Sequence, residues 1–146
     1  MTASPSGPST TSPLGVVGDG ASPTLMGMAI DRIIDIFPGP QQPQARLQLA
    51  ASLRAVLTQI LIPSTLHGGR VPAIERLICT YAVSHHIREG RNHQIPSLIQ
   101  AGAADGMVTL ERSLASLVRK GRITRAAALA HTRDEDGLRK LLGSAS

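Results

Sequence analysis

Three histidines are the first side chains in this sequence that could do chemistry. His85, His86 and His93 could bind a metal ion, because neutral imidazole is a common metal ligand. Ligands carried by one helix usually stand three or four residues apart, whereas adjacent residues point about 100° apart around the helix axis. His93 also lies beyond Gly90, where we expect the helix to end. We therefore interpret these histidines as solvated or interfacial, with His93 hydrogen-bonding locally, and expect no metal site.

Cys79 is the only cysteine, so the sequence offers neither an internal disulfide nor a zinc site built from cysteine pairs. A reducing compartment such as the cytoplasm suits a chain with a single thiol. A nucleophilic cysteine needs a neighbouring base or a helix N-terminus to lower its pKa. Cys79 instead closes an apolar run with β-branched character, so we expect a buried and unreactive thiol.

The formal net charge of +5 admits three kinds of partner: nucleic acid, an anionic membrane surface or an acidic protein. Phe37 and Tyr81 are the only aromatic residues, which argues against binding single strands by base stacking. The main basic run has a net charge of +4, because Glu111 offsets one of its five cations. The cations are Arg112, Arg119, Lys120, Arg122 and Arg125. We interpret the run as a solvated helix face, with an acidic partner or an anionic membrane as the alternative and nucleic acid least favoured.

Residues 1–24 are rich in Ser, Thr, Pro and Gly, a composition that cannot bury enough apolar surface to fold, so we expect a disordered tail. No apolar stretch approaches the ~20 residues that span a bilayer. No basic segment followed by an apolar run opens the sequence. We therefore expect neither a transmembrane span nor a signal peptide.

Helical periodicity begins at Leu25 and predicts a first helix as far as Phe37, where Pro38-Gly39-Pro40 ends it. A second helix is predicted from Pro43 to about Leu57.

The period then changes to that of strands. The apolar runs 59–62 and 71–79, separated by a turn at Ser64–Gly69, predict a β-hairpin, which could be the edge of a larger sheet. From Tyr81 onward the pattern is helical again, and Thr109, Thr124 and Asp134 are expected N-caps. The predicted fold class is therefore mostly α with a β-hairpin.

Three stretches together resemble a known family: residues 29–38 (AIDRIIDIFP), residues 82–95 (AVSHHIREGRNHQI), and residues 97–124 with Gly106-Met107 inside them. In order and spacing they are similar to the type IV pilus-retraction ATPases, the twitching-motility or PilT-type branch of the type II/IV secretion ATPase family. The resemblance covers Ala29 to Leu142. Three matches in register are more specific than any one of them.

The resemblance implies a C-terminal remnant of a RecA-like α/β ATPase core at residues 25–80, followed by a C-terminal helical domain at residues 81–143. The second stretch resembles the family signature AIRNLIRE with its trailing G-K-T-H-Q-I, although Ser84-His85-His86 stands where that signature has Arg-Asn-Leu. The residues that the resemblance assigns to a signature or coupling role are Ala82, Val83, Ile87, Arg88, Glu89, Gly90, His93 and Gln94. For Arg88 and Glu89 a surface ion pair is an equally open reading.

The phosphate chemistry of the family is missing from this sequence. ATP binding needs the loop G-x-x-x-x-G-K-[ST], in which backbone N–H groups and a lysine hold the phosphates and a hydroxyl holds Mg²⁺. The chain contains no Gly-Lys pair, and no apolar strand ends in an acidic pair. We therefore assign no catalytic, cofactor-binding or metal residue, leave ATP and Mg²⁺ to the full-length family, and expect no ATPase activity from the chain alone.

One short segment imitates a further family motif. Ser64-Thr65-Leu66-His67 reads like the S-T-L-H segment that the family carries, but it falls between the two predicted strands. We interpret it as the hairpin turn.

The resemblance also implies partners and a location: a homo-oligomer or full-length motor subunits, in a hexameric assembly, with a pilus platform at the inner membrane. It implies a cytoplasmic protein that could sit at the periphery of that membrane. Two alternatives remain open. One is a small basic helical module that regulates a full-length motor, and the other, less favoured, is a nucleic-acid-binding helical domain.

Overall fold

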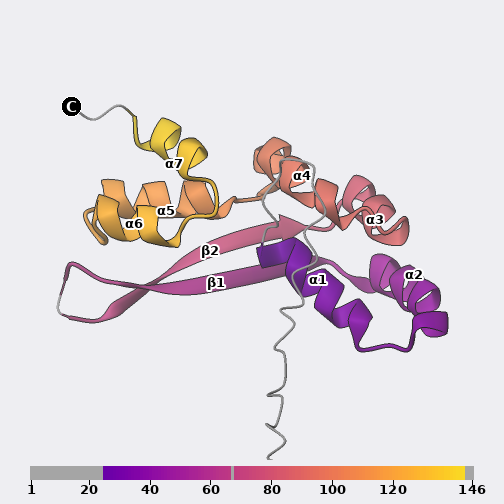
Figure 1. Ribbon diagram of the computed structural model, residues 1–146. Coiled ribbons are helices and arrows are strands. Elements are labelled where there is room, and N and C mark those ends of the chain that lie inside the picture. The colour runs from indigo at the N-terminus through magenta and orange to yellow at the C-terminus, as the bar shows by residue number, and fades with distance from the viewer. Residues whose placement is uncertain (1–24, 67, 144–146) are drawn as a thin grey trace, which may run out of the picture.

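The computed structural model describes residues 25–66 and 68–143, and the expected tail at residues 1–24 lies outside them. A long two-stranded antiparallel hairpin forms the axis of this part, and its helices gather along the hairpin at both ends (Figure 1). The elements are α1 (Leu25–Asp35), η1 (Gly39–Gln41), α2 (Gln42–Ser52), β1 (Ala55–Pro63), β2 (Arg70–Ile78), α3 (Tyr81–Arg88), η2 (Asn92–Gln94), α4 (Ile95–Ala101), η3 (Gly102–Asp105), α5 (Leu110–Arg119), α6 (Arg125–His131) and α7 (Glu135–Leu142). The predicted class, mostly α with a β-hairpin, is confirmed.

The expected boundary between the second helix and the first strand was wrong. Helix α2 ends at Ser52 rather than at Leu57, because Leu53 already has extended backbone angles (φ −68°, ψ 127°). Strand β1 then begins at Ala55, and Cys79 N donates to Arg54 O (2.9 Å) to close the ladder at that end. The alternation of β-branched residues through β1 favours a strand, and tertiary pairing with β2 outweighs the apolar spacing that suggested a longer helix.

Two hydrophobic clusters lie along one face of the hairpin. The first packs α1–α4 around Leu77 of β2; its buried residues are Met26, Ile30, Ala50, Leu77, Val83, Ile87, Ile95, Ile99 and Met107. The second packs α5–α7 on the strand ends near the turn; its buried residues are Ile62, Val71, Ala73, Leu110, Leu114, Ala115, Ile123, Ala128 and Leu138. Each cluster takes residues from both sides of Thr80, so packing crosses the boundary that separates the two expected domains. The boundary between residues 25–80 and residues 81–143 of this chain therefore stays a prediction.

The helices begin where side-chain caps were expected. Arg112 N donates to Thr109 Oγ1 (3.2 Å) and Ala127 N donates to Thr124 Oγ1 (3.0 Å). Gly137 N donates to Asp134 Oδ1 (2.9 Å). These three caps confirm the predicted starts of α5, α6 and α7.

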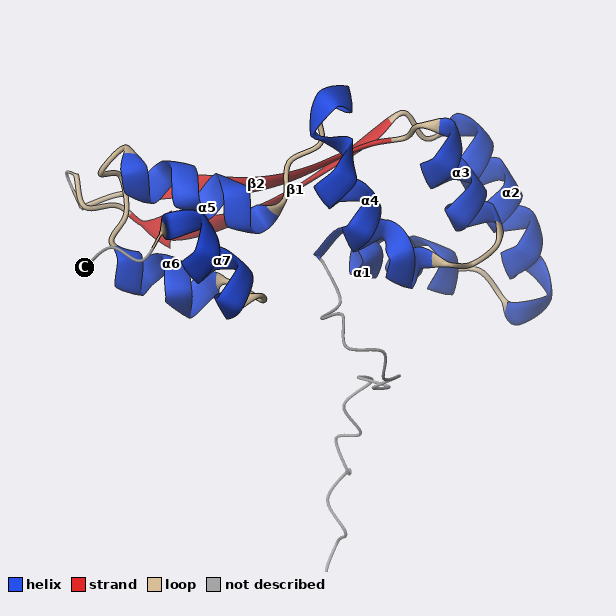
Figure 2. Ribbon diagram, turned by 90° about the horizontal axis from the view of Figure 1, so that it is seen from above, coloured by secondary structure: helices blue, strands red, loops and turns tan. Residues whose placement is uncertain are grey.

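The molecule has two distinct ends. Seen from above, the hairpin turn lies with α5 and α6 at one end, and α2 and α3 lie at the other (Figure 2). Helices in the described part are too short or too polar to cross a bilayer.

Candidate functional site

The signature segment forms helix α3 and the turn that follows it. Thr80 caps the helix, since its Oγ1 accepts from Val83 N (3.4 Å). At the other end Gly90 N donates to Ile87 O (3.1 Å) and Arg91 N donates to His86 O (2.8 Å). This pair of bonds is a Schellman motif, and it requires the left-handed conformation that Gly90 adopts (φ +70°). A glycine at this position is therefore a backbone requirement of the turn.

The structure divides the eight signature residues into two groups. Val83 and Ile87 are fully buried in the first hydrophobic cluster, so they anchor α3. The other six are exposed on α3 and the turn after it: Ala82, Arg88, Glu89, Gly90, His93 and Gln94. The segment thus combines two buried apolar anchors with an exposed, largely polar surface.

The turn is tied to α1 and α2 by side chains that the sequence did not single out. Asn92, only 4% exposed, donates from Nδ2 to Asp31 Oδ1 (2.6 Å) and joins η2 to α1. The Arg46 guanidinium of α2 packs against Gly90. A side chain at position 90 would touch it, since its Cβ would lie 3.7 Å from Arg46 Cζ. The pairing of Asp31 with Asn92 could not be found from spacing, since 61 residues separate the two.

Buried polar atoms without a hydrogen-bond partner in the described residues also gather around this turn. They are Arg46 Nη1, His86 Nδ1 and Asn92 Oδ1. Such atoms are costly to bury, and native structures contain few of them. The corner between α1, α2 and η2 is therefore the part of the described chain where polar packing is least complete.

Arg88 and Glu89 do not form the surface pair that was one of their two readings. Within the part of the chain that the structure describes, the salt bridge present is Arg139–Glu135 on α7, and neither signature residue joins one. Both side chains are exposed at the signature end. They are thus free to meet a partner surface.

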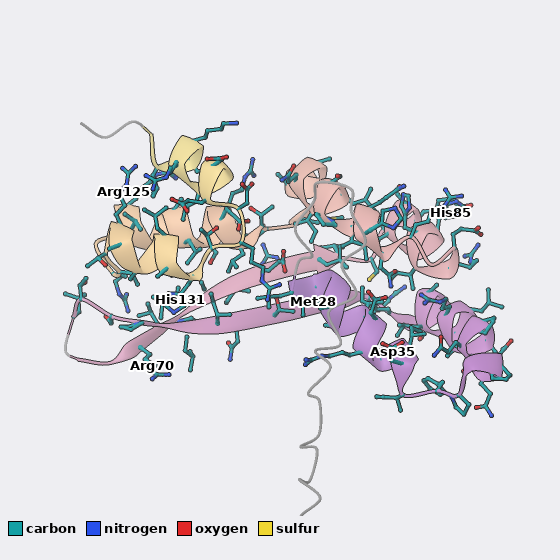
Figure 3. All side chains as sticks on the ribbon, in the orientation of Figure 1. Met28, Asp35, Arg70, His85, Arg125 and His131 are labelled. Carbon is teal, nitrogen blue, oxygen red and sulfur yellow. The ribbon has the colours of Figure 1, made fainter. Side chains whose placement is uncertain are left out.

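The histidines lie at the same end but do not converge. The rings of His85 and His86 have centroids 6.0 Å apart and meet nearly edge to face, while His93 is exposed beyond the turn. Figure 3 places His85 on the outer side of α3. Among residues 25–66 and 68–143, no group of three His, Cys, Asp or Glu side chains could hold a metal ion.

Two titratable groups near the C-terminal half of β2 have pKa values raised by burial. Cys79, half-buried just after β2, has its thiol pKa raised by burial, which disfavours the reactive thiolate. Glu75, 3% exposed on β2, was missed by the sequence reasoning. Its Oε2 accepts from Met26 N (3.2 Å) and Thr58 Oγ1 (3.4 Å), so a carboxylate from the hairpin caps the start of α1. Burial raises the pKa of this carboxyl, and nearby Glu111 adds to the increase.

In the segment that imitates S-T-L-H, Ser64, Thr65 and Leu66 lie in the predicted hairpin turn, and His67 is outside the described residues. Ser64 N donates to Gly69 O (2.8 Å), and Leu66 N donates to Ser64 Oγ (3.0 Å).

The pairing of the hairpin also determines which of its backbone groups face outward. The bonds from Ser64 N to Gly69 O and from Cys79 N to Arg54 O follow the same register as Ala55 opposite Ile78. Hydrogen-bonded pairs alternate along an antiparallel ladder, so even-numbered residues of β1 pair inward and odd-numbered ones turn their N–H and C=O outward. Even-numbered residues of β2 turn outward by the same rule.

The outer side of β2 is covered by the chain itself. Arg76 exchanges two backbone bonds with Val108 (2.9 and 3.0 Å), and Ile74 N donates to Ser113 Oγ of α5 (2.9 Å). Pro72, which has no N–H, occupies another outward position on this strand.

The outer side of β1 is not covered in the same way. We call its outward backbone groups, at Ala55, Leu57, Gln59 and Leu61, the bare edge. None of them has a hydrogen-bond partner among residues 25–66 and 68–143. The side chains of Leu57 and Leu61 are 61% and 50% exposed there. An unpaired strand edge with exposed apolar side chains is a template for another strand.

The chain was compared with known families and structures. No family model matches it. A twitching motility protein of Neisseria gonorrhoeae is 40% identical over 109 residues, which are 75% of this chain and 29% of that protein. The type IV pilus retractation ATPase PilT of Pseudomonas aeruginosa is 42% identical over 102 residues, which are 70% of this chain and 29% of that protein.

Solved structures agree. The crystal structure of the pilus retraction motor PilT with bound ADP matches with a TM-score of 0.66 and 36% identity, over 78% of this chain and 31% of that one. The ATPase DotB of Legionella pneumophila, at 16% identity and a TM-score of 0.58, shares the fold over 73% of this chain and 29% of that one. The chain therefore spans 29–31% of the length of these proteins. We conclude that it belongs to the PilT-type pilus-retraction ATPases, as a relative of their C-terminal part.

Proposed function

We propose that this chain acts as the C-terminal part of a pilus-retraction motor, and that it works only when joined to a nucleotide-binding core. The core supplies the phosphate-binding loop that this sequence lacks. The chain supplies the end of the sheet and the contact surface of α3. Motion driven by ATP in the core would reach neighbouring subunits through that surface.

The observation that carries this proposal is the bare edge of β1. Three odd-numbered residues with outward N–H groups, Leu57, Gln59 and Leu61, offer a ladder for one more strand. The relatives are more than twice as long as this chain, so they contain polypeptide that could provide that strand. We propose that this strand is an extended segment of the core that precedes α1 in the relatives.

The position of α1 supports the same occupant. Met26 N at the start of α1 bonds to Glu75, whose cross-strand partner is Thr58 in the middle of β1. Polypeptide that precedes α1 in a longer protein would therefore join the molecule beside the middle of the bare edge. Little loop is needed between such a strand and α1.

The signature turn is the second part of the proposal. Val83 and Ile87 fix α3 to the first cluster, while Asn92 and Arg46 tie the turn to α1 and α2. The exposed Arg88, Glu89 and Gln94 would then move as one rigid unit with the end of the sheet. We propose that they contact a neighbouring subunit in a homo-oligomer at the cytoplasmic side of the inner membrane.

The experiment mixes the 146-residue chain with a separately produced core of a PilT-type ATPase, truncated before the helix that corresponds to α1. We expect the two to co-elute and the mixture to hydrolyse ATP faster than either part. Absence of a complex, or binding of ATP by the chain alone, would contradict the proposal.

The regulatory alternative makes a different prediction in the same assay. An intact motor already carries its own C-terminal part, so the corresponding edge should be occupied. Binding of the chain to the intact motor but not to the truncated core would favour a regulatory module.

A further inference from the structure

The hairpin turn and the α5–α6 loop, far apart in sequence, form one end of the molecule. Thr65 N donates to Arg122 O (3.0 Å), and Thr65 Oγ1 donates to Gly121 O (2.6 Å). Both views place the hairpin turn beside α5 and α6 (Figures 1 and 2). These bonds fix the hairpin turn to the α5–α6 loop, although Thr65 and Gly121 are 56 positions apart in the sequence.

This end is cationic and carries no acidic side chain in either of its segments. Residues 59–74 and 112–133 contain no Asp or Glu. We call the end the cationic tip; it comprises Leu66 and five cations, Arg70, Arg119, Lys120, Arg122 and Arg125. Figure 3 shows Arg70 and Arg125 at this end of the hairpin.

The charges of the tip are not neutralised within the described residues. Arg70, Arg119, Lys120 and Arg122 are exposed, Arg125 is half-buried, and none of the five forms an ion pair there. The Arg119 guanidinium donates to the neutral carbonyl of Leu141, which leaves its charge uncompensated. At the opposite end, by contrast, Asp31, Asp35 and Glu89 lie among the arginines.

One apolar side chain is exposed in the hairpin turn at this end. Leu66, in the hairpin turn, is 47% exposed, although burial of a leucine in the protein would be favourable. Its backbone N–H is held by Ser64 Oγ, so the turn has a defined conformation at this residue. An exposed apolar residue at a cationic end of a protein suits the boundary between lipid headgroups and acyl chains.

We infer that the cationic tip binds the surface of an anionic lipid bilayer. Each Lys or Arg close to such a surface strengthens binding about five-fold, so five of them suffice for reversible attachment. Nucleic acid fits the tip less well, because both aromatic residues, Phe37 and Tyr81, lie outside it at the ends of α1 and α3. The inference goes beyond the proposed function and does not depend on the bare edge.

The test measures co-sedimentation of the whole chain with phosphatidylcholine vesicles that contain about one third phosphatidylglycerol. The tip variant reverses three exposed charges: Arg70→Glu, Lys120→Glu and Arg122→Glu. The matched control reverses three exposed charges at or near the opposite end: Arg32→Glu, Arg54→Glu and Arg91→Glu. Both variants have the same net charge, so they separate position from total charge.

We expect the wild-type chain to bind anionic vesicles, to bind neutral ones weakly, and to release as salt rises. The tip variant should lose on the order of 100-fold in affinity, and the control variant only a few-fold. Leu66→Ser should weaken binding by several-fold with no change in the salt dependence. Circular dichroism of each variant shows whether it is folded, and Lys120→Gln with Arg122→Gln provides a milder tip variant.

Three results would overturn the inference. Equal losses in the tip and control triples would show that net charge, not the tip, governs binding. Absence of binding to anionic vesicles would remove the lipid surface as the partner. Tighter, tip-dependent binding to duplex DNA or to an acidic polypeptide than to vesicles would assign the tip to that other class.

Discussion

The two outer edges of the hairpin differ although the strands are equal in length. On β2 the outward backbone groups of Ile74 and Arg76 are bonded to α5 and to Val108. On β1 the outward groups of Leu57 and Leu61 have no partner in the described residues, and their side chains are exposed. One edge is completed by the chain that follows it, and the other has the chemistry of an interface. Among the described residues, the edge still open to pairing therefore lies on the β1 side.

The difference also separates stability from function. Substitutions in the paired or buried parts of the hairpin should lower the free energy of unfolding, whereas those on the bare edge should leave the chain folded and prevent it from joining a core. Four predictions sharpen this contrast.

The largest effect is expected from proline at neighbouring positions of β1. Ile60→Pro removes an inward N–H of the ladder and should cost about 3 kcal/mol or more in the free energy of unfolding. Gln59→Pro removes only an outward N–H, so it should cost about 1 kcal/mol or less, yet abolish binding to the truncated core. Urea denaturation and co-elution measure the two effects. Equal destabilisation by both prolines would show that the assignment of inward N–H groups to even-numbered residues of β1 is wrong.

Leucine to alanine on the two sides should differ next. Leu77→Ala deletes a fully buried side chain of the first cluster and should cost about 2–5 kcal/mol. Leu57→Ala deletes one that is 61% exposed and should change stability by about 0.5 kcal/mol or less. Chemical denaturation of both variants provides the comparison. A large loss from Leu57→Ala would mean that the bare edge is packed within this chain.

A smaller effect is expected where α5 covers β2. Ser113→Ala removes the acceptor of Ile74 N–H and should cost about 1 kcal/mol. Ser116→Ala on the same helix is the control, since it has the same change in helix propensity without that bond. Thermal or urea unfolding of the two variants tests whether α5 truly completes the β2 edge.

The smallest effect concerns pH. The pKa of Glu75 is raised above 4.5 in the folded chain, so folding is favoured when this carboxyl is protonated. The stabilisation from Glu75 is therefore fully present below pH 4.5. It is lost as the pH rises through the raised pKa that Glu75 has in the folded chain. Glu75→Gln keeps an acceptor for Met26 N–H and should flatten this loss of stability with rising pH. Urea midpoints between pH 4.5 and 7 measure it, and an unchanged slope in Glu75→Gln would exclude Glu75 as its source.

Local signals in the sequence predicted local structure well. Thr109, Thr124 and Asp134 cap the helices that they were expected to cap, because capping involves only the next three residues. The family resemblance found the signature helix, and Gly90 ends it as expected. The start of β1 was misplaced because Leu53 and Leu57 have helical spacing, while pairing with β2 decided the outcome.

Features that depend on distant contacts were not predictable. Asn92 with Asp31, and Glu75 with Met26, join residues 61 and 49 positions apart. Whether the odd- or the even-numbered residues of β1 turn their N–H and C=O groups outward depends on which cross-strand pairs are hydrogen-bonded. Only the observed register shows this. The cationic tip likewise needs the bonds between Thr65 and the α5–α6 loop, although its cations were visible as a run.

Amide hydrogen exchange along β1 tests the central claim most directly. In the chain alone, Val56, Thr58 and Ile60 should exchange slowly, whereas Leu57, Gln59 and Leu61 should exchange fast. Addition of the truncated core should slow the three odd-numbered amides and leave the even-numbered ones slow. A complex in which Leu57, Gln59 and Leu61 still exchange fast would contradict the assignment of the bare edge as the site where the core strand pairs.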